Sequence, residues 1–486
     1  MFGIMFAATK LHSHDKMHPM RNRYIYITLL SLLGFSAEAT AQAFIQASNN
    51  SQALAQTPKL VVTISVHQLR TDHLETYAPL YGEDGLKRLL TAGTVYTNGS
   101  YPFTPVDAAA AAATLATGTT PYYHGISSRE WFDRTTLRTV KVVRDAKYGY
   151  SSAQLATSTL GDELKIATEG VAKVFSFAAD AESAILSAGH AADGAAWVEQ
   201  GKWQTTSYYA PVNQWLSGYT RLYPPMADVN SSLTKMALHC VEQAGYGLDE
   251  KTDLLSVSYS VTPTMESYVA LDQNVAELIS GITRRIPLDR VLFVLTSTGS
   301  PKEEEDNDNE RYRIPTGKFS ISRTAGLLNM YLGATYGSEQ YVEAIYSNQL
   351  FLNHKLLERK NINMSELLRR SQEFILQLSG VRNVYTASQL LTSDSYLLER
   401  IRGGFNVEKC GDLLIDIAPG WQLVNEDTQT SVTSRASNIP FPIIFYGAST
   451  SSQRIETPVT VDHIAPTIAR AIRIRAPNAC SAEPLF

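Results

Sequence analysis

The feature that most limits the fold of this chain is a set of short apolar runs rich in β-branched residues. Residues 59–66 read KLVVTISV and are flanked by polar residues, as is typical of a strand buried on both faces. Similar runs predict strands at 254–260, 290–296 and 442–446, and apolar residues at helical spacing predict helices at 85–90, 266–282 and 464–472. Strands that alternate with helices predict an α/β fold with a largely parallel central sheet and helices on both faces. Ligands of such sheets bind beyond the carboxyl ends of the strands.

A cap subdomain is expected as an insertion in this domain, which we place at residues 58–486. Residues 302–310 read KEEEDNDNE, the most polar run of the chain, and are interpreted as a solvated loop. Residues 315–430 then add helices and a Gly403–Gly404 turn before the chain returns to the sheet. We therefore expect cap or insertion segments at about 127–215 and 302–430.

The beginning of the chain has the pattern of a secretory signal. Residues 20–41 carry two arginines, then the apolar run Tyr24 to Phe35, then small residues that end in Ala39-Thr40-Ala41. We expect cleavage near Ala41, a linker at 42–57, and a start codon placed too early to account for residues 1–19. The apolar run is too short to span a bilayer, so no transmembrane segment is expected. The predicted product is exported, either periplasmic or associated with the outer membrane.

The composition is that of a globular protein. The 486 residues are 44% hydrophobic and carry a net charge of -5, which gives no electrostatic reason to expect nucleic acid as a partner. The three cysteines are Cys240, Cys410 and Cys480. Export permits disulfides, and a Cys410–Cys480 bridge that leaves Cys240 free stays open beside three buried thiols.

Residues 105–118 read PVDAAAAAATLATG and predict the start of a helix. Asp107 is well placed to cap that helix, because its carboxylate can accept hydrogen bonds from the first free backbone N–H groups. Alanine is the best helix former, so the six-residue run from Ala108 favours a helix that carries no reactive side chain at its beginning.

Short motifs occur in order over nearly all of the mature chain. They include YGEDGLKRLL at 81–90, TG at 117–118, WFDR at 131–134, GDELK at 161–165, GHAADG at 189–194, LD at 271–272, GDLL at 411–414 and FYG at 445–447. This series resembles the alkaline phosphatase superfamily, in particular the branch of Bacteroidetes-type phosphate-irrepressible alkaline phosphatases and nucleotide pyrophosphatase-phosphodiesterases. The resemblance implies an alkaline-phosphatase-like fold. It also implies two zinc ions held by Asp and His, a Thr or Ser nucleophile at a helix start, and an Asn, Lys or Arg clamp on phosphate.

The residues that the resemblance assigns to zinc and to nucleophilic attack are replaced. The nucleophile position falls on Ala108, and an Asp ligand after the first strand becomes His67. The metal loop after Ser260 shrinks to Val-Thr-Pro-Thr around Pro263. The remaining ligand positions fall on Thr298, Gly299 and Pro440. Because one imidazole does not hold zinc, no resident metal or other cofactor is expected.

The phosphate clamp has also changed sign. The resemblance places its Asn at Arg129, and its Lys and Arg at Asp180 and Glu182. Together with Asp107, the two acidic residues would repel a phosphate at this position. A cleft that binds a neutral or cationic ligand without turnover is compatible with this pattern.

Two functional hypotheses follow. The first is a catalytically inactive member, a pseudoenzyme with a binding, scaffolding or regulatory role and a protein partner in the periplasm or at the outer membrane. The alternative is a phosphate mono- or diester hydrolase with a rebuilt site, which would use His67, Asp72, His73 and Asp107 for a metal, zinc included. Its nucleophile would be Thr104 or Thr114. His124 and His190 lie outside the metal set and are interpreted as structural.

Overall fold

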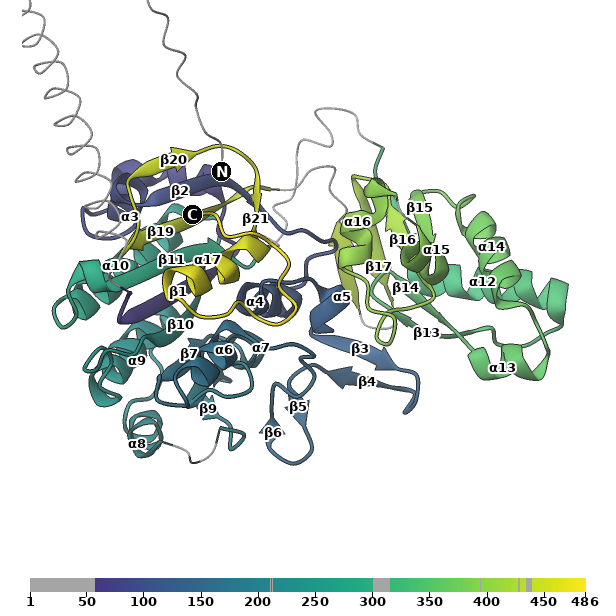
Figure 1. Cartoon of the computed structure of the whole chain (residues 1–486). Coiled ribbons are helices and arrows are strands. Elements are labelled where there is room, and N and C mark those ends of the chain that lie inside the picture. The colour runs from purple at the N-terminus through teal and green to yellow at the C-terminus, as the bar shows by residue number, and fades with distance from the viewer. Residues whose placement is uncertain are drawn as a thin grey trace, which may run out of the picture. The chain divides into compact units, whose positions relative to one another are not determined.

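The centre of the protein is a ten-stranded sheet (Figure 1). The computed structural model describes residues 57–299 and 315–486, except positions 210, 212, 394, 427–428 and 434–438. The strand order is β20-β2-β19-β11-β1-β10-β7-β8-β9, and β21 pairs with β2. The bounds are β20 Gln453–Ile455, β2 Thr94–Ser100, β19 Phe441–Gly447, β11 Val291–Ser297, β1 Leu60–His67, β10 Asp253–Ser260, β7 Val174–Ala178, β8 Gly194–Glu199, β9 Lys202–Thr205 and β21 Val459–Thr460. In this sheet β19 and β9 run antiparallel to their neighbours, so the predicted largely parallel sheet is confirmed.

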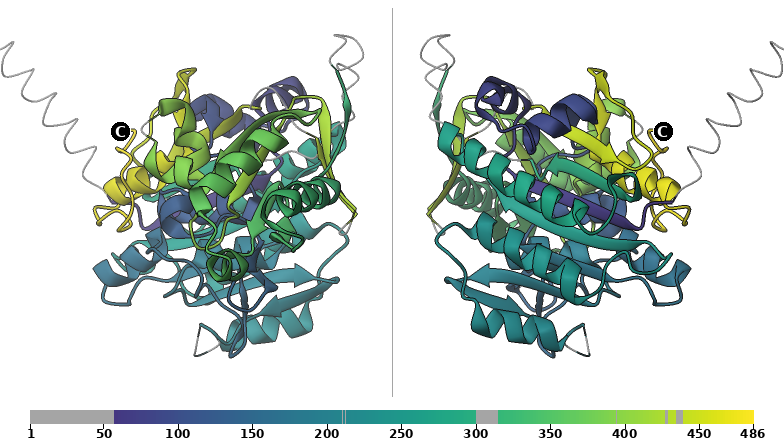
Figure 2. Two further views of the ribbon diagram at one scale, coloured as in Figure 1. Left: turned by 90° about the vertical axis from the view of Figure 1, so that its right-hand side faces the viewer. Right: turned by 90° about the vertical axis from the view of Figure 1, so that its left-hand side faces the viewer.

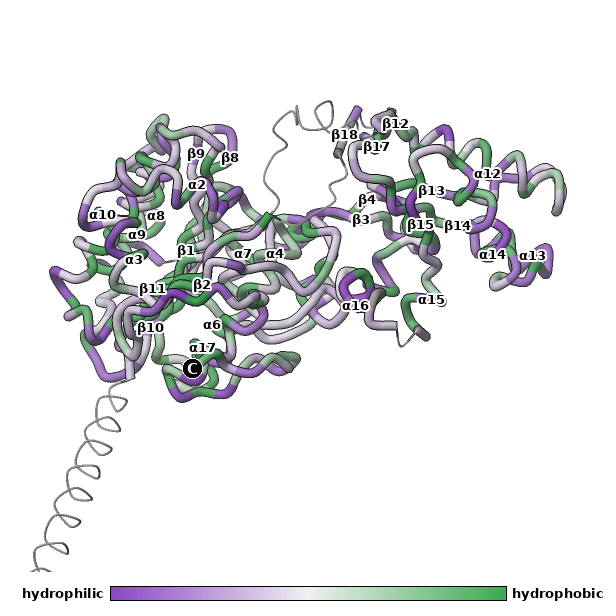
Figure 3. The backbone as a smooth tube through the Cα atoms, turned by 90° about the horizontal axis from the view of Figure 1, so that it is seen from above, coloured by the Kyte–Doolittle hydropathy of each residue, from purple (hydrophilic) through white to green (hydrophobic). Residues whose placement is uncertain are grey.

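Helices cover both faces of the sheet, as the two views in Figure 2 show. One face packs against α3 (Leu86–Ala92), α9 (Val229–Gln243) and α10 (Met265–Thr283). The other packs against α4 (Ala108–Thr117), α6 (Leu160–Ala167), α7 (Ala181–Ala188) and α17 (Ile464–Ala471). Both faces of β1 are apolar for this reason, since Val62 and Ile64 enter one core and Val61 the other. The central strands are correspondingly hydrophobic in Figure 3.

The helices and strands expected from the sequence are all present, with ends that differ by one or two residues. The helix expected at 266–282 is α10, and the strand expected at 442–446 is β19. The strand β1 continues one residue beyond its predicted end, to His67.

Residues 317–425 build most of a separate set of elements, which appears in green in Figure 1. A four-stranded sheet has the order β13-β14-β16-β15, and β12, β17 and β18 form a second sheet. These elements are β12 Gly317–Ser320, β13 Val342–Tyr346, β14 Gln349–Leu352, β15 Val381–Thr386, β16 Leu413–Ile417, β17 Trp421–Asn425 and β18 Thr430–Thr433, with helices α12 Ile321–Tyr336, α13 His354–Arg359, α14 Met364–Ile375, α15 Ala387–Thr392 and α16 Tyr396–Gly403. We call this set the cap.

The other expected insertion, 127–215, is narrower than the sequence suggested. Within it, the hairpins β3–β4 (Glu130–Asp133 and Arg138–Lys141) and β5–β6 (Arg144–Asp145 and Gly149–Tyr150) lie outside the main sheet. In contrast, β7, β8 and β9 are members of the main sheet. The physical reason is that β7 is buried along its whole length, which a surface insertion would not be.

The hairpin β3–β4 holds the cap through one buried carboxylate. Arg134 forms an ion pair with Asp412 at 3.0 Å, and His354 bonds to the other carboxylate oxygen at 2.9 Å. The backbone N–H of Leu352 also donates to Asp412 at 2.7 Å. Burial acts to raise the pKa of the Asp412 carboxyl, but the hydrogen bond from His354, the positive charge of Arg134 and the hydrogen bond from Leu352 together hold it below its usual value. This cluster joins a hairpin of the core to a sheet of the cap.

The end of α16 is a second contact between cap and core. The guanidinium of Arg400 donates to the carbonyl of Tyr101 at 3.0 Å, and the N–H of Thr104 donates to the carbonyl of Arg400 at 3.0 Å. At Gly404 a Cβ would lie 2.6 Å from the carbonyl oxygen of Thr104, so this position requires glycine. The Gly403–Gly404 turn therefore lets the cap approach the loop that leads into α4.

Cys240, Cys410 and Cys480 are all free thiols, so the candidate Cys410–Cys480 bridge is not formed. None of the helices in the described part of the chain is long and apolar enough to cross a membrane. The leader, signal, linker up to residue 56 and acidic run 302–310 lie outside the described residues.

Candidate functional site

The positions that the resemblance assigns to metal ligands gather at the carboxyl edge of the central strands. His67 ends β1, and its carbonyl accepts from the N–H of Val261, directly after β10, at 3.1 Å. On the other side, the N–H of Thr298 donates to Val66 at 3.2 Å. The ring nitrogen Nδ1 of His67 lies 3.0 Å from the hydroxyl of Thr298. The parallel pairing therefore brings these positions together as expected for the carboxyl edge of such a sheet.

Pro263 and Pro440 have no side-chain atom that could bind a metal ion at this edge. Only residues 261–264 separate β10 from α10, and the hydroxyl of Thr264 caps that helix by accepting from the N–H of Ser267 at 3.3 Å. Pro440 precedes β19, and its carbonyl accepts from the N–H of Thr71 at 3.1 Å. The first contact makes the shortened loop a regular helix start, and the second uses a backbone carbonyl for packing.

Gly299 is a position at which a ligand side chain would be strained. Its φ is +69°, in the left-handed region that favours glycine. A Cβ there would also lie 3.1 Å from the ring of Tyr101 and 3.3 Å from Val106. The backbone after β11 has thus a conformation that suits glycine and not Asp or His.

The residues of the rebuilt-site hypothesis do not form a metal site. Asp72 accepts from the side chain of Arg70 at 2.9 Å, and the ring of His73 packs edge-on against Tyr268. Within residues 57–299 and 315–486, leaving out the undescribed positions, no three His, Cys, Asp or Glu side chains are grouped so that they could hold a metal ion. The donor set at this edge, a single imidazole with hydroxyl, glycine and proline neighbours, does not fit the zinc pair that the resemblance implies.

Asp107 caps α4, the helix whose first residue is Ala108. Its carboxylate accepts from the N–H of Ala109 at 2.9 Å. Burial raises the pKa of the Asp107 carboxyl, while the hydrogen bond from Ala109 and the positive charge of Arg129 oppose that rise. The start of a helix attracts anions because its first backbone N–H groups are free. Here the protein's own carboxylate accepts the hydrogen bond of one of these groups.

The alanine run serves the packing of α4 against α7. Ala109 to Ala113 are at most 2% exposed, and Ala109, Ala112 and Ala113 share a core cluster with Ala184 and Ala188 of α7. Small side chains on both helices permit this close contact. The run therefore has a structural reason that does not depend on catalysis.

The two acidic clamp positions lie at the start of α7. Asp180 caps this helix by accepting from the N–H of Ser183 at 2.8 Å. Glu182 lies in the first turn, where burial and, to a lesser extent, the neighbouring Asp180 raise the pKa of its carboxyl. Arg129 is exposed and opposes this rise in pKa, as it does at Asp107. Arg129 therefore links the two acidic helix starts electrostatically.

Tyr346, at the end of cap strand β13, is a residue of this region that the sequence did not reveal. Burial raises the pKa of its phenol, and the negative charges of Glu130 and Asp107 add to that rise. The Ser128 hydroxyl and Arg129 act in the opposite direction. No sequence signal places Tyr346 here, because the link between β13 and α4 depends on how the cap docks.

Thr114, one of the nucleophiles of the rebuilt-site hypothesis, is fully buried and bonded to His124 at 2.9 Å. The other ring nitrogen of His124 accepts from the N–H of Ile126 at 3.1 Å, so the neutral ring donates to Thr114. Burial lowers the pKa of His124 to about 3, with a smaller effect from Lys409. His124 and Thr114 therefore act as a structural pair.

The mostly parallel sheet with helices on both faces defines an α/β protein. Residues 61–439 match the family described as type I phosphodiesterase / nucleotide pyrophosphatase, and the chain belongs to this family within the alkaline phosphatase superfamily. The predicted resemblance is thereby confirmed.

Relatives with similarity over most of their length carry enzyme names. The chain is 21% identical to the alkaline phosphatase PafA of Elizabethkingia meningoseptica, over 88% of this chain and 94% of that protein. It is 26% identical to a calcium-transporting ATPase of Myroides odoratus, over 88% and 94%. It is 23% identical to the alkaline phosphatase PhoV of Synechococcus elongatus, over 94% and 98%. The crystal structure of wild-type PafA superposes with a TM-score of 0.79 over 88% of this chain and 98% of that chain, which supports the alkaline-phosphatase-like fold.

Proposed function

We propose that this chain is a catalytically silent member of its family that keeps the fold for a binding, scaffolding or regulatory role in the cell envelope. The observation that carries the proposal is the set of side chains at the former metal positions. His67, Pro263, Thr298, Gly299 and Pro440 provide one strong zinc ligand between them. A zinc site needs three or four protein ligands, so this edge is not suited to zinc.

The start of α4 supports the same conclusion. Ala108 has no hydroxyl with which to attack phosphorus, and the Asp107 carboxylate occupies the N–H of Ala109. A phosphate ester that approached this helix would meet a negative charge where an active relative is expected to offer a nucleophile. Two separate requirements of phosphoryl transfer, the attacking group and the anion site, are therefore absent from the same helix start.

Hydrolysis at a rebuilt site remains the competing function. It would need His67, Asp72, His73 and Asp107 to share a metal, and a reactive hydroxyl nearby. Asp72 is instead paired with Arg70, and the hydroxyl of Thr114 is buried and bonded to a neutral histidine. These contacts favour the silent reading over the rebuilt site.

The binding role includes a protein partner in the periplasm or at the outer membrane. Export through the signal at residues 20–41, with cleavage near Ala41, would bring the mature chain to that compartment. Affinity purification of the tagged full chain from its native envelope tests this part. Specific enrichment of an envelope protein supports the partner, and the absence of any enriched protein removes the support for a scaffolding role.

Metal analysis of the purified mature protein, combined with assays on p-nitrophenyl phosphate and bis-p-nitrophenyl phosphate, tests the catalytic part. We expect substoichiometric zinc and no turnover above that of a His67→Ala control prepared in the same way. Stoichiometric metal, together with turnover that a chelator abolishes and that His67→Ala lacks, would overturn the proposal.

A further inference from the structure

Hydroxyl side chains collect on one buried face of the central sheet, the face that packs under α4, α6, α7 and α17. Near the beginning of the strands this face is apolar, with Val61, Leu254 and Leu292. Nearer the carboxyl edge it carries Thr63 and Ser65 on β1, Ser256 and Ser258 on β10, and Thr296 on β11. The parallel register sets Thr63 opposite Ser256, and Ser65 opposite both Ser258 and Thr296.

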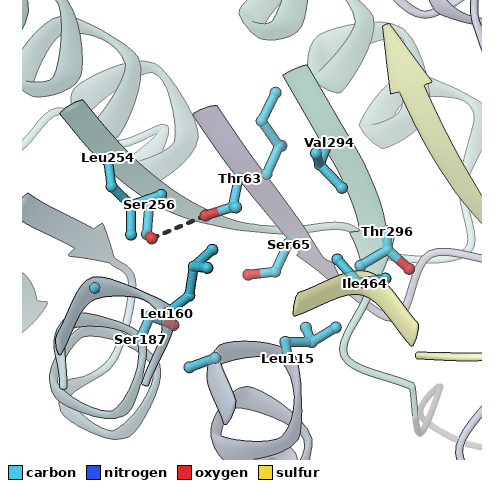
Figure 4. A pocket seen from close by; sticks show the side chains of 13 residues that line it. Thr63, Ser65, Leu115, Leu160, Ser187, Leu254, Ser256, Val294, Thr296 and Ile464 are labelled. Carbon is cyan, nitrogen blue, oxygen red and sulfur yellow. Dashed lines mark hydrogen bonds between the residues drawn. The ribbon is translucent and has the colours of Figure 1, made fainter. Parts of the chain in front are cut away.

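A cavity lies against this face, between the sheet and the covering helices (Figure 4). Its volume is about 40 Å³. Its lining includes the hydroxyl residues Thr63, Ser65 and Ser256 from the sheet and the apolar Leu115, Leu160 and Ile464 from the helices.

The volume decides what can occupy this cavity. A water molecule needs roughly 10–15 Å³ on this measure, so the space suits about three waters. Pockets for drug-sized ligands measure roughly 300–1,000 Å³, so a nucleotide or an aryl phosphate does not fit. The residue of α4 that lines the cavity is Leu115, near the end of that helix, so the cavity is separate from the helix start at Ala108.

The hydroxyl groups on this face of the sheet are not fully paired with one another. Thr63 donates to Ser256 at 2.8 Å, so the proton of Ser256 must find another acceptor. Ser65 and Ser258 lie 2.6 Å apart and share one hydrogen bond, in which either can donate, so one of their two protons is also left over. The hydroxyl of Thr296 on β11, which also lines the cavity, is buried and has no hydrogen-bond partner among the described residues. A buried hydroxyl without a partner is destabilising, and a hydrogen bond to water removes that cost.

We propose that this cavity is a hydration site, in which a cluster of about three water molecules accepts hydrogen bonds from the hydroxyls of β1 and β10 beneath α4. The water cluster is part of the fold, and the inference does not depend on whether the protein is catalytic. A polar, roomy cavity binds ordered water, whereas an apolar cavity of similar size stays dry.

A pair of isosteric substitutions separates a hydrated cavity from a dry one. Val294→Thr adds a hydroxyl to the cavity lining, and Val62→Thr adds one to the fully packed opposite face of the sheet. In a hydrated cavity, water bonds the new hydroxyl at position 294, so the melting temperature should fall by less than half as much as in Val62→Thr. Equal falls for the two variants would overturn the proposal.

A high-resolution crystal structure of the mature protein, with and without xenon, provides a direct and independent measurement. We expect solvent density within hydrogen-bonding distance of Ser65 or Ser256 and no xenon in the cavity. Xenon bound there, or a cavity without solvent density, would show that it is dry and would refute the hydration site. This measurement does not require any variant to fold.

Discussion

Substitution of Asp107 tests whether the protein's own carboxylate excludes anions from the start of α4. The side chain has two effects: it caps the helix through the 2.9 Å bond to Ala109, and it places a negative charge at the helix start. Asp107→Ser keeps a capping oxygen and removes the charge, whereas Asp107→Ala removes both. Loss of an N-cap costs about 1 kcal/mol, so Asp107→Ala should melt about 1–2 °C below Asp107→Ser at pH 7 in a domain of this size. Asp107→Ser should be at least as stable as the wild type, because the buried carboxylate that it removes is costly to keep charged.

Asp107→Ser should also change the affinity of the helix start for phosphate. Two unit negative charges about 4 Å apart repel by about 4 kcal/mol at an effective dielectric constant of 20, and by about 1 kcal/mol in water. Even the smaller value predicts that Asp107→Ser, in which the serine still caps α4, binds phosphate about fivefold more tightly than the wild type does. Titration calorimetry with inorganic phosphate at constant ionic strength measures this ratio. If the phosphate affinities of the wild type and Asp107→Ser differ by less than twofold, Asp107 does not exclude anions from the start of α4 and the reasoning fails.

Three further outcomes are expected. Burial raises the pKa of Glu182, so its contribution to stability is present at low pH and is lost as the pH rises through that raised pKa; Glu182→Gln should therefore raise the melting temperature at pH 7 but not at pH 4. Ala108→Thr returns a hydroxyl to the start of α4 without metal ligands, so p-nitrophenyl phosphate turnover should stay at the wild-type level, and a clear gain would contradict the loss of the metal site. Arg134→Ala removes a cation from the buried Asp412 carboxylate and should lower the free energy of unfolding by roughly 2–4 kcal/mol, whereas the exposed Arg138→Ala on the same hairpin should change it by less than about 0.5 kcal/mol in chemical denaturation.

The sequence predicted the central strands and most of their covering helices because their apolar patterns are strong. The run at 59–66 and the helix at 266–282 each carry the period of their own secondary structure, so their type follows from local residues. The strand β7, in contrast, is only five residues long and was placed in an insertion. Its place in the main sheet depends on pairing with β10 and β8, which are distant in sequence.

The candidate site was predicted to a similar extent. The capping role of Asp107 follows from its position before an alanine helix, and the structure confirms that role. Asp180 also precedes a helix, α7, and caps it, although the resemblance implies a phosphate-clamp residue at this position. The place of Tyr346 could not be predicted, since it depends on the docking of the cap through Arg134 and Asp412.

Motifs that match the family and remain in this chain build buried contacts between distant segments. The motif at 81–90 is held by Asp272, whose carboxylate accepts from the N–H groups of Gly82 and Leu86 at 2.8 and 2.6 Å. The motif at 161–165 meets the one at 189–194 in the same way, because Asp162 accepts from the N–H of His190 at 2.8 Å. In both cases one surviving motif provides the carboxylate and another provides its donors.

The motifs at 131–134 and 411–414 form a third pair through Arg134 and Asp412. All three pairs need a complete set of partners, since a buried carboxylate without its donors is strongly destabilising. The positions that the resemblance assigns to the nucleophile and to a ligand have no such role: Ala108 is the first residue of α4, directly after its cap Asp107, and Gly299 suits a left-handed turn beside Tyr101. The residues that hold the fold together are thus present, whereas the positions that the resemblance assigns to zinc carry one imidazole among hydroxyl, glycine and proline residues, which is the pattern that the proposed binding role predicts.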